Sequence, residues 1–152
     1  MANTKKSVLQ LEQFLPYRLS VAANLVSDVI ASSYRSLFGL TVPQWRLLAV
    51  LAEGHHATQQ ELGAATRMDK LVVSRAAVAL VQRRLVRRAA NSDDQRSHLL
   101  VLAKNGRALY ARVAPKAIEL EAQLLAGLSR AEREHLRELL LRLEVTALHL
   151  SP

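Results

Sequence analysis

The spacing of helix start and stop signals constrains this chain more than any other feature. Three capping boxes, in which serine or threonine is followed three residues later by glutamate or glutamine, begin at Thr41, Thr58 and Ser129. Asp69 is a further N-cap candidate, and Gly39 stands where a long first helix is expected to end. The signals therefore divide the chain into several helices of defined length.

Apolar residues recur at helical spacing between these signals. We expect a first helix over about 9–38, a second that stops at Gly54, two short central helices after Thr58 and Asp69, a fifth over about 104–128 and a last one after Ser129. The apolar phase is lost around Pro115, which predicts a bend or an irregular turn there.

Between residues 85 and 102 the pattern changes from helical to extended. Two short runs, 85–89 and 97–102, flank the turn-rich segment 91–94 and predict a hairpin. An isolated hairpin is only marginally stable, so it must pack on neighbouring helices. The expected fold is mostly α, with a small two- to three-stranded β-wing following a helix-turn-helix.

The 152-residue chain has a net charge of +8, and the excess lies in one block. Residues 67–112 contain eleven Lys or Arg and three Asp or Glu, whereas the segments before and after them carry +1 and −1. Such a block favours phosphate binding through the release of counterions. A solvated basic face is the alternative interpretation.

Composition argues against several other classes of protein. No apolar run is long enough to cross a membrane, and no signal peptide is recognisable at the start. Without cysteine there is no disulfide or thiolate metal site, and His55 and His56 have no carboxylate cluster beside them. No phosphate loop, nucleophile elbow or paired-carboxylate motif occurs. We expect a cytoplasmic protein that is not an enzyme and takes no metal or cofactor.

The order helix, helix, helix-turn-helix, hairpin, helix, helix resembles the MarR family of bacterial transcription regulators. Within it, Asp94-Gln95-Arg96 matches the Asp-x-Arg signature of the family's wing, and the segments 40–51 and 102–106 are also similar to the family. The resemblance implies a winged helix-turn-helix domain over 41–103. It also implies a helical dimerisation region built from 1–40 and 104–152.

Three positions depart from the family pattern. Arg84 stands where the family commonly has a glycine that ends the recognition helix, and arginine tolerates a left-handed backbone poorly. Ala103 replaces the usual threonine cap of the fifth helix. Leu71 and Val72 replace residues that are more often small and polar.

An α-helix fits into the major groove of DNA. The outward residues near the N-terminus of the helix after Asp69 are therefore candidates for base contacts. Arg75 is suited to a guanine edge, and Leu71 or Val72 to thymine methyl groups, although both are also plausible core residues. The other candidates on the helix-turn-helix are Gln59, Gln60, Lys70 and Ser74, the two glutamines lying where helix N–H groups favour phosphate.

By resemblance, Arg96 of the wing enters the minor groove, where narrow A·T tracts attract a guanidinium, and Asp94 holds Arg96 in place. The alternative is a surface ion pair between the two, which is worth roughly 0–1 kcal/mol. Phosphate contacts, which set register without reading sequence, are expected from Arg83, Arg84, Arg87, Arg88 and His98.

Leucines of the last helix form an apolar stripe that must meet another helix, in the same chain or a second one. The resemblance implies a homodimer, and its two-fold symmetry predicts a pseudopalindromic operator. Two arginines on apolar helices, Arg18 beside Tyr17 and Arg46 beside Trp45, suggest a pocket for a ligand carboxylate with an aromatic wall. Internal pairing or solvation of these arginines is the alternative.

The sequence thus predicts a sequence-specific, DNA-binding transcription regulator. By resemblance it is a repressor that a small aromatic or phenolic carboxylate releases from its operator. Two alternatives remain, a nonspecific architectural nucleic-acid binder and a helical protein-interaction dimer.

Overall fold

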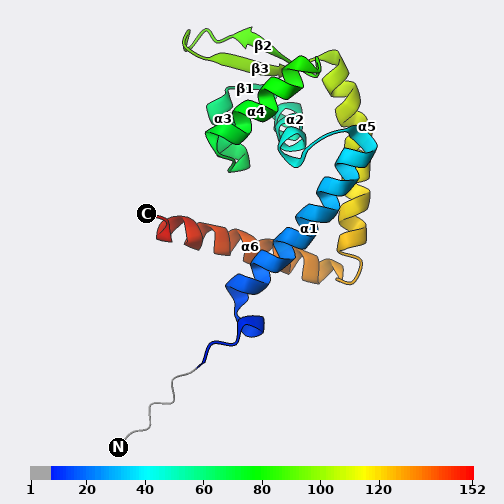
Figure 1. Ribbon diagram of the computed structural model, residues 1–152, viewed down its shortest axis with the longest axis vertical. Coiled ribbons are helices and arrows are strands. Elements are labelled where there is room, and N and C mark those ends of the chain that lie inside the picture. The colour runs from blue at the N-terminus through cyan, green and yellow to red at the C-terminus, as the bar shows by residue number, and fades with distance from the viewer. Residues whose placement is uncertain (1–7) are drawn as a thin grey trace, which may run out of the picture. The chain divides into compact units, whose positions relative to one another are not determined.

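Six α-helices and a three-stranded antiparallel sheet make up residues 8–152, the part of the chain that the computed structural model describes (Figure 1). The elements are a 3-10 helix η1 (Leu11–Gln13), α1 (Leu15–Phe38), α2 (Val42–Gly54), β1 (His56–Ala57), α3 (Gln59–Thr66), α4 (Lys70–Gln82), β2 (Val86–Ala90), β3 (His98–Leu102), α5 (Lys104–Leu124) and α6 (Arg130–Leu150). They form two compact units, one ending at Val113 and the other beginning at Ala114.

The three predicted capping boxes are confirmed at the starts of α2, α3 and α6. In each, the hydroxyl of the N-cap residue accepts from the backbone N–H three residues later, and that residue's side chain accepts from the N-cap N–H. The bonds from Thr58 hold the pKa of Glu61 below its usual 4.5, and those from Ser129 do the same for Glu132. Since the shift is downward, these carboxylates stabilise their helices at neutral pH and lose that effect only as the pH falls below the usual value.

The first helix begins later than predicted. We expected it from about residue 9, but Leu11–Gln13 form a 3-10 turn, Phe14 is extended with φ −78° and ψ 107°, and α1 starts at Leu15. Pro16 explains the difference because proline lacks an N–H and clashes with the preceding turn, so it is tolerated only in the first turn of a helix. At the other end Gly39 caps the helix as predicted, with φ +61°.

Three other helix ends have a non-glycine residue with positive φ, namely His55 after α2, Arg67 after α3 and Arg84 after α4. Helix α2 stops at Gly54 as predicted, and the residue that follows it, His55, has φ +69°. After α4, Arg84, which replaces a family glycine, has φ +58°. The N–H groups of Arg84 and Leu85 donate to the carbonyls of Val81 and Leu80 at 2.9 and 3.0 Å, which is the Schellman arrangement.

The sheet has the strand order β1-β3-β2, and both pairings are antiparallel. The hairpin lies one residue later than predicted, with Val86 opposite Leu102 and Ala90 opposite His98. A third strand, β1, is only two residues long and pairs His56 with Val101. The wing is therefore anchored to the segment between α2 and α3 as well as to α4.

The core of the first unit is entirely apolar, and among the described residues no polar or charged side chain is buried. The predicted inner face of α4, made of Val73, Ala76, Ala77 and Leu80, is buried. It packs with α2, α3 and β2, which contribute Leu48, Leu62, Val86 and other buried side chains. This packing fixes α4 and the wing relative to each other.

Helix α5 approaches the end of α4 closely at Gly106. The N–H of Ala103 donates to the carbonyl of Leu85 at 2.9 Å. A Cβ on Gly106 would lie 2.0 Å from the same carbonyl oxygen. Only glycine therefore fits at this crossing.

Helix α5 runs without interruption past Pro115 to Leu124, so the predicted irregular turn is absent and the helix ends four residues earlier than expected. In the second unit Arg133 donates from Nε to the carbonyl of Leu128 at 3.0 Å and from Nη2 to that of Leu125 at 2.8 Å. No residue of α6 is buried. Within residues 8–152, no helix has the length and apolar character needed to cross a membrane.

We expect Gly106→Ala to destabilise the protein by about 2–4 kcal/mol, because the added methyl group meets a backbone carbonyl that cannot rotate away. The matched control is Gly54→Ala, where nothing lies within 4 Å of the new Cβ. Urea denaturation measures both variants. Equal stability of the two would contradict the close approach of α5.

Arg84→Gly is expected to raise stability by about 0.5–1 kcal/mol, since glycine adopts φ +58° without steric cost. Arg84→Ala removes the same charge but keeps the Cβ, and so separates strain from electrostatics. An equal rise in melting temperature for both variants would show that charge, not backbone conformation, is responsible.

Candidate nucleic-acid interface

The outer face of α4 carries both polar and apolar side chains near the N-terminus of the helix. The Asp69 carboxylate accepts from the N–H of Val72 at 2.9 Å and so defines where the helix begins. Lys70 and Arg75 are exposed, while Val72 and Ser74 are partly buried. Leu71 is 57% exposed, so it does not belong to the core. An exposed leucine beside cationic side chains is suited to contact with the apolar edge of a base.

The two helices of the helix-turn-helix meet at a hollow of about 470 Å³. Three of the predicted site residues, Gln59, Gln60 and Lys70, line it together with Gly63, Met68 and Val73. The structure thus brings the start of α3 and the start of α4 together. The N-terminus of a helix carries the positive end of its dipole, so residues at the starts of both helices give this region an electropositive character.

The wing tip is organised by short polar side chains. Asp94 Oδ1 accepts from the backbone N–H of Arg96 at 2.9 Å, and Asn91 donates from Nδ2 to Ser97 Oγ at 2.9 Å. Asp94 therefore holds the backbone of Arg96, and the ion pair considered as the alternative does not form in the described chain. The guanidinium of Arg96 is left exposed at the tip.

The strand register separates the basic side chains of the wing. Residues directly opposite each other in an antiparallel pair share a face, and neighbours along a strand alternate. Arg88, opposite Leu100, shares a face with His98, whereas Arg87, opposite Val101, lies on the other face. The expected row of phosphate contacts is therefore divided between two faces.

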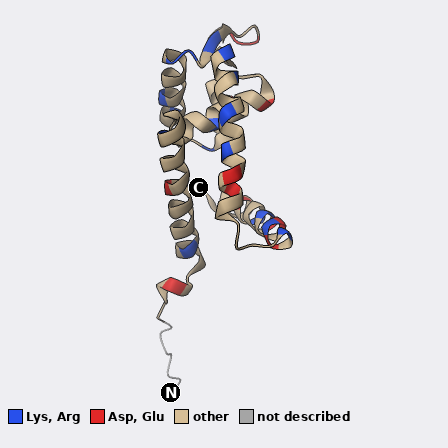
Figure 2. Ribbon diagram, turned by 90° about the vertical axis from the view of Figure 1, so that its right-hand side faces the viewer, with Lys and Arg blue, Asp and Glu red and all other residues tan. Residues whose placement is uncertain are grey.

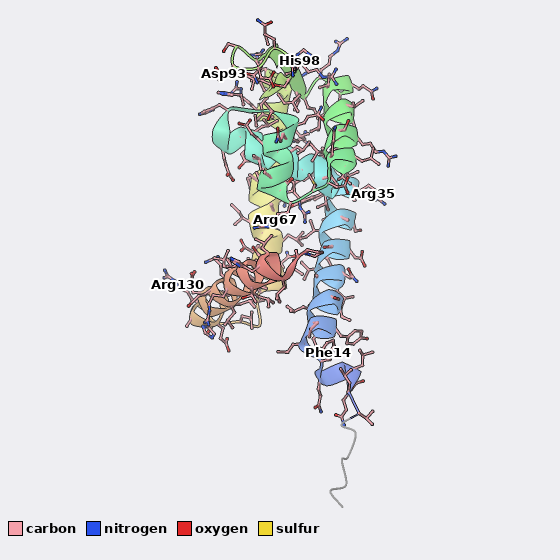
Figure 3. All side chains as sticks on the ribbon, turned by 90° about the vertical axis from the view of Figure 1, so that its left-hand side faces the viewer. Phe14, Arg35, Arg67, Asp93, His98 and Arg130 are labelled. Carbon is pink, nitrogen blue, oxygen red and sulfur yellow. The ribbon has the colours of Figure 1, made fainter. Side chains whose placement is uncertain are left out.

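Among the residues that the structure describes, those of the basic block (67–112) form no ion pairs. The two ion pairs within residues 8–152, Lys116–Glu119 and Arg137–Glu134, both lie outside residues 67–112. Figure 2 shows Lys and Arg on the wing and the neighbouring helices, and in Figure 3 His98 and Asp93 mark the wing end of the first unit. The positive potential of this surface is therefore not cancelled by neighbouring carboxylates.

Arg83 has a contact that sequence reasoning missed. Its Nη1 donates to the carbonyl of Gly39 at 2.9 Å and its Nη2 to that of Phe38 at 3.3 Å. Of the five predicted phosphate contacts, Arg83 is the one whose guanidinium is bonded inside the described chain. No local signal indicates the pairing, because the partners are more than forty residues apart and meet only in the fold.

The four predicted ligand-binding residues lie in two separate places. Trp45 stacks on Tyr110 with ring centres 5.5 Å apart, and it meets Tyr34 edge-on at 5.5 Å. Burial raises the pKa of the Tyr34 phenol. Tyr17 lies seventeen residues before Tyr34 on α1, about 25 Å along the helix axis. Within a single chain, Tyr17 and Arg18 are therefore too far from Trp45 and Arg46 to form one pocket with them.

The chain is similar to known transcription regulators in sequence and in fold. The MarR family model matches residues 38–97. A probable transcriptional regulator from Pseudomonas aeruginosa is 34% identical, with 88% of this chain and 99% of that one covered and a TM-score of 0.81. A MarR/EmrR family regulator from Acinetobacter sp. ADP1 is 26% identical over 91% of this chain and 98% of that one, with a TM-score of 0.83.

Two solved structures with lower identity share the fold. A mutant MarR from E. coli, complexed with operator DNA, is 24% identical over 90% of this chain and 99% of that one, with a TM-score of 0.80. The second is BpsR from Bordetella bronchiseptica, whose DNA binding is regulated by 6-hydroxynicotinic acid. It is 22% identical over 91% of this chain and 98% of that one, with a TM-score of 0.85. From these matches and the winged helix-turn-helix described above, the chain belongs to the MarR family of DNA-binding transcriptional regulators.

Proposed function

We propose that this regulator is a homodimeric repressor that binds a pseudopalindromic operator and leaves it when a small aromatic carboxylate binds. The observation that carries the proposal is the surface of α4 and the wing, whose cationic side chains are exposed and form no ion pair with any residue of 8–152. Counterion release from DNA phosphates makes such a surface bind duplexes.

Base recognition is assigned to α4. Arg75 is exposed on its outer face and has the fork geometry that pairs with the O6 and N7 atoms of guanine, and Leu71 is placed for a thymine methyl group. Arg96 at the wing tip is assigned to the minor groove. The remaining predicted contacts, apart from that of Arg83, are assigned to phosphates. The E. coli MarR solved in complex with operator DNA supports operator binding by this fold.

Dimerisation is supported by apolar side chains that each unit leaves exposed. On α6 the predicted stripe of Leu136, Leu139, Leu140 and Leu143 is 38–46% exposed. On α1 Leu25, Val26 and Val29 are 41–62% exposed. Contiguous apolar surface of this kind marks association, and a two-fold dimer places its recognition helices about one DNA turn apart.

The effector is assigned to the carboxylate class because an arginine follows an aromatic residue in the sequence at two places, Arg46 after Trp45 and Arg18 after Tyr17. The regulation of BpsR by 6-hydroxynicotinic acid, an aromatic acid, supports this class. Trp45 packs on Tyr34, which lies about 25 Å along α1 from Tyr17, so each of the two places is proposed as a separate half of the ligand site.

Arg75→Ala is expected to relax base preference at one operator position by about 1–3 kcal/mol, and Arg96→Ala to weaken binding to all duplexes about ten- to a hundredfold. Fluorescence anisotropy measures both against a duplex selected by the wild-type protein and its single-base variants. Arg130→Ala, which removes an equal charge outside the basic block, is the control.

Other outcomes identify the alternatives. Equal affinity for the selected and the scrambled duplex would show a nonspecific architectural binder, and no duplex binding would favour a protein-interaction dimer. Full affinity of Arg96→Ala would remove the wing from the mechanism.

The ligand proposal predicts that 6-hydroxynicotinic acid releases the wild-type protein from its duplex and changes the fluorescence of Trp45, the single tryptophan. Arg46→Ala is expected to lower the sensitivity of release at least tenfold, because the carboxylate loses a bidentate partner. Arg46→Lys, which keeps the charge without the fork, should be intermediate. Release of Arg46→Ala at the wild-type ligand concentration would contradict the assignment.

A further inference from the structure

Within residues 8–152, few hydrogen bonds from a side chain reach a residue far away in the sequence. Apart from the bonds of Arg83, every side-chain hydrogen bond within residues 8–152 joins residues no more than eight positions apart, the longest being that of Arg133 to Leu125. Both ion pairs span three positions. Arg83, which reaches Phe38 and Gly39 from the end of α4, supplies the two exceptions.

Helix α1 is attached to the rest of the first unit through its last turns. Tyr34 is its single buried residue, and the ring of Tyr34 meets Trp45 of α2. The guanidinium of Arg112 on α5 lies 5.8 Å from the centre of the Phe38 ring. Figure 1 shows the N-terminal part of α1 extending away from α4 and the sheet. The angle between α1 and the rest of the first unit is therefore determined by contacts at the C-terminal end of α1.

The chemistry of the Arg83 contact is suited to fixing that angle. The carbonyls at the end of a helix lack partners within it and carry the negative end of the dipole. A guanidinium spans two adjacent acceptors with a rigid planar fork, whereas an ammonium group is a single charge on a flexible stem. Arg83 binds two successive carbonyls in this way, at 2.9 and 3.3 Å.

We propose that Arg83 is a positioning residue for operator binding, which fixes the angle between α1 and α4 and does not contact DNA. In a dimer held by its terminal helices, this angle sets the separation of the two recognition helices. The inference rests on the proposed function, in which α1 belongs to the dimerisation region and α4 reads the operator.

A positioning role and a phosphate contact differ in two measurable ways. Loss of one phosphate contact reduces the slope of log affinity against log salt by about 1. Loss of a positioning contact leaves that slope unchanged, but weakens discrimination between correctly and incorrectly spaced half-sites. The distance between half-sites is read by the separation of the helices and not by any one side chain.

The experiment uses the full-length protein and a duplex that it selects from a random pool, together with a derivative carrying two extra base pairs between the half-sites. For Arg83→Ala we expect the preference for the correct spacing to fall about tenfold, with an unchanged salt slope. Arg83→Lys keeps the charge and loses the fork, so it should lose the spacing preference as well. Arg88→Ala is the control, with a reduced slope and the wild-type spacing preference.

A reduced salt slope with intact spacing preference in Arg83→Ala would overturn the proposal by making Arg83 a phosphate contact. Wild-type behaviour of both variants would overturn it too. If Arg83→Ala fails to fold, as judged by its thermal melt, Arg83→Lys decides the question. Failure of the wild-type protein to select any duplex would refute the proposed function itself, which is a separate outcome.

Discussion

The burial of the inner face of α4 is the interaction on which the rest of the structure depends. Val73, Ala77 and Leu80 pack into an apolar core shared with α2, α3 and β2, and that core contains no buried polar side chain among the described residues. Because one face of α4 is fixed in this way, the opposite face must carry Leu71 and Arg75 to the solvent. The same core includes Val86 and Leu100, so the wing has a defined direction relative to the helix.

Stability and function therefore use different parts of this molecule. Apolar burial and local helix caps stabilise the first unit, and neither requires the arginines of the basic block to pair with carboxylates. Those arginines repel one another, and salt screens this repulsion. Arg83 is different because it is committed to the carbonyls at the end of α1. In this account one arginine aligns the helices while its neighbours bind the nucleic acid.

Features encoded within a few residues were predictable from the sequence, and features that need the register or the tertiary fold were not. The capping boxes at Thr41, Thr58 and Ser129 and the buried face of α4 follow from spacings of three or four residues. The resemblance marked the helix end at Arg84 as unusual, but the left-handed conformation of Arg84 is seen only in the structure. The two-residue strand β1 is too short to show alternation. Alternation alone places Arg87 and Arg88 on opposite faces, but which of them shares a face with His98 requires the exact pairing of β2 with β3. The contact from Arg83 to Gly39 spans 44 positions and has no local signature.

Site-directed cleavage of DNA tests most directly whether α4 and the wing face the duplex. The chain has no cysteine, so Val78→Cys on α4, Gln95→Cys on the wing and Gln123→Cys on α5 each carry one iron chelate. The account predicts cuts within each half-site from position 78, cuts in the flanking minor groove from position 95, and none from position 123. Cleavage from position 123, or unlocalised cleavage from positions 78 and 95, would contradict it.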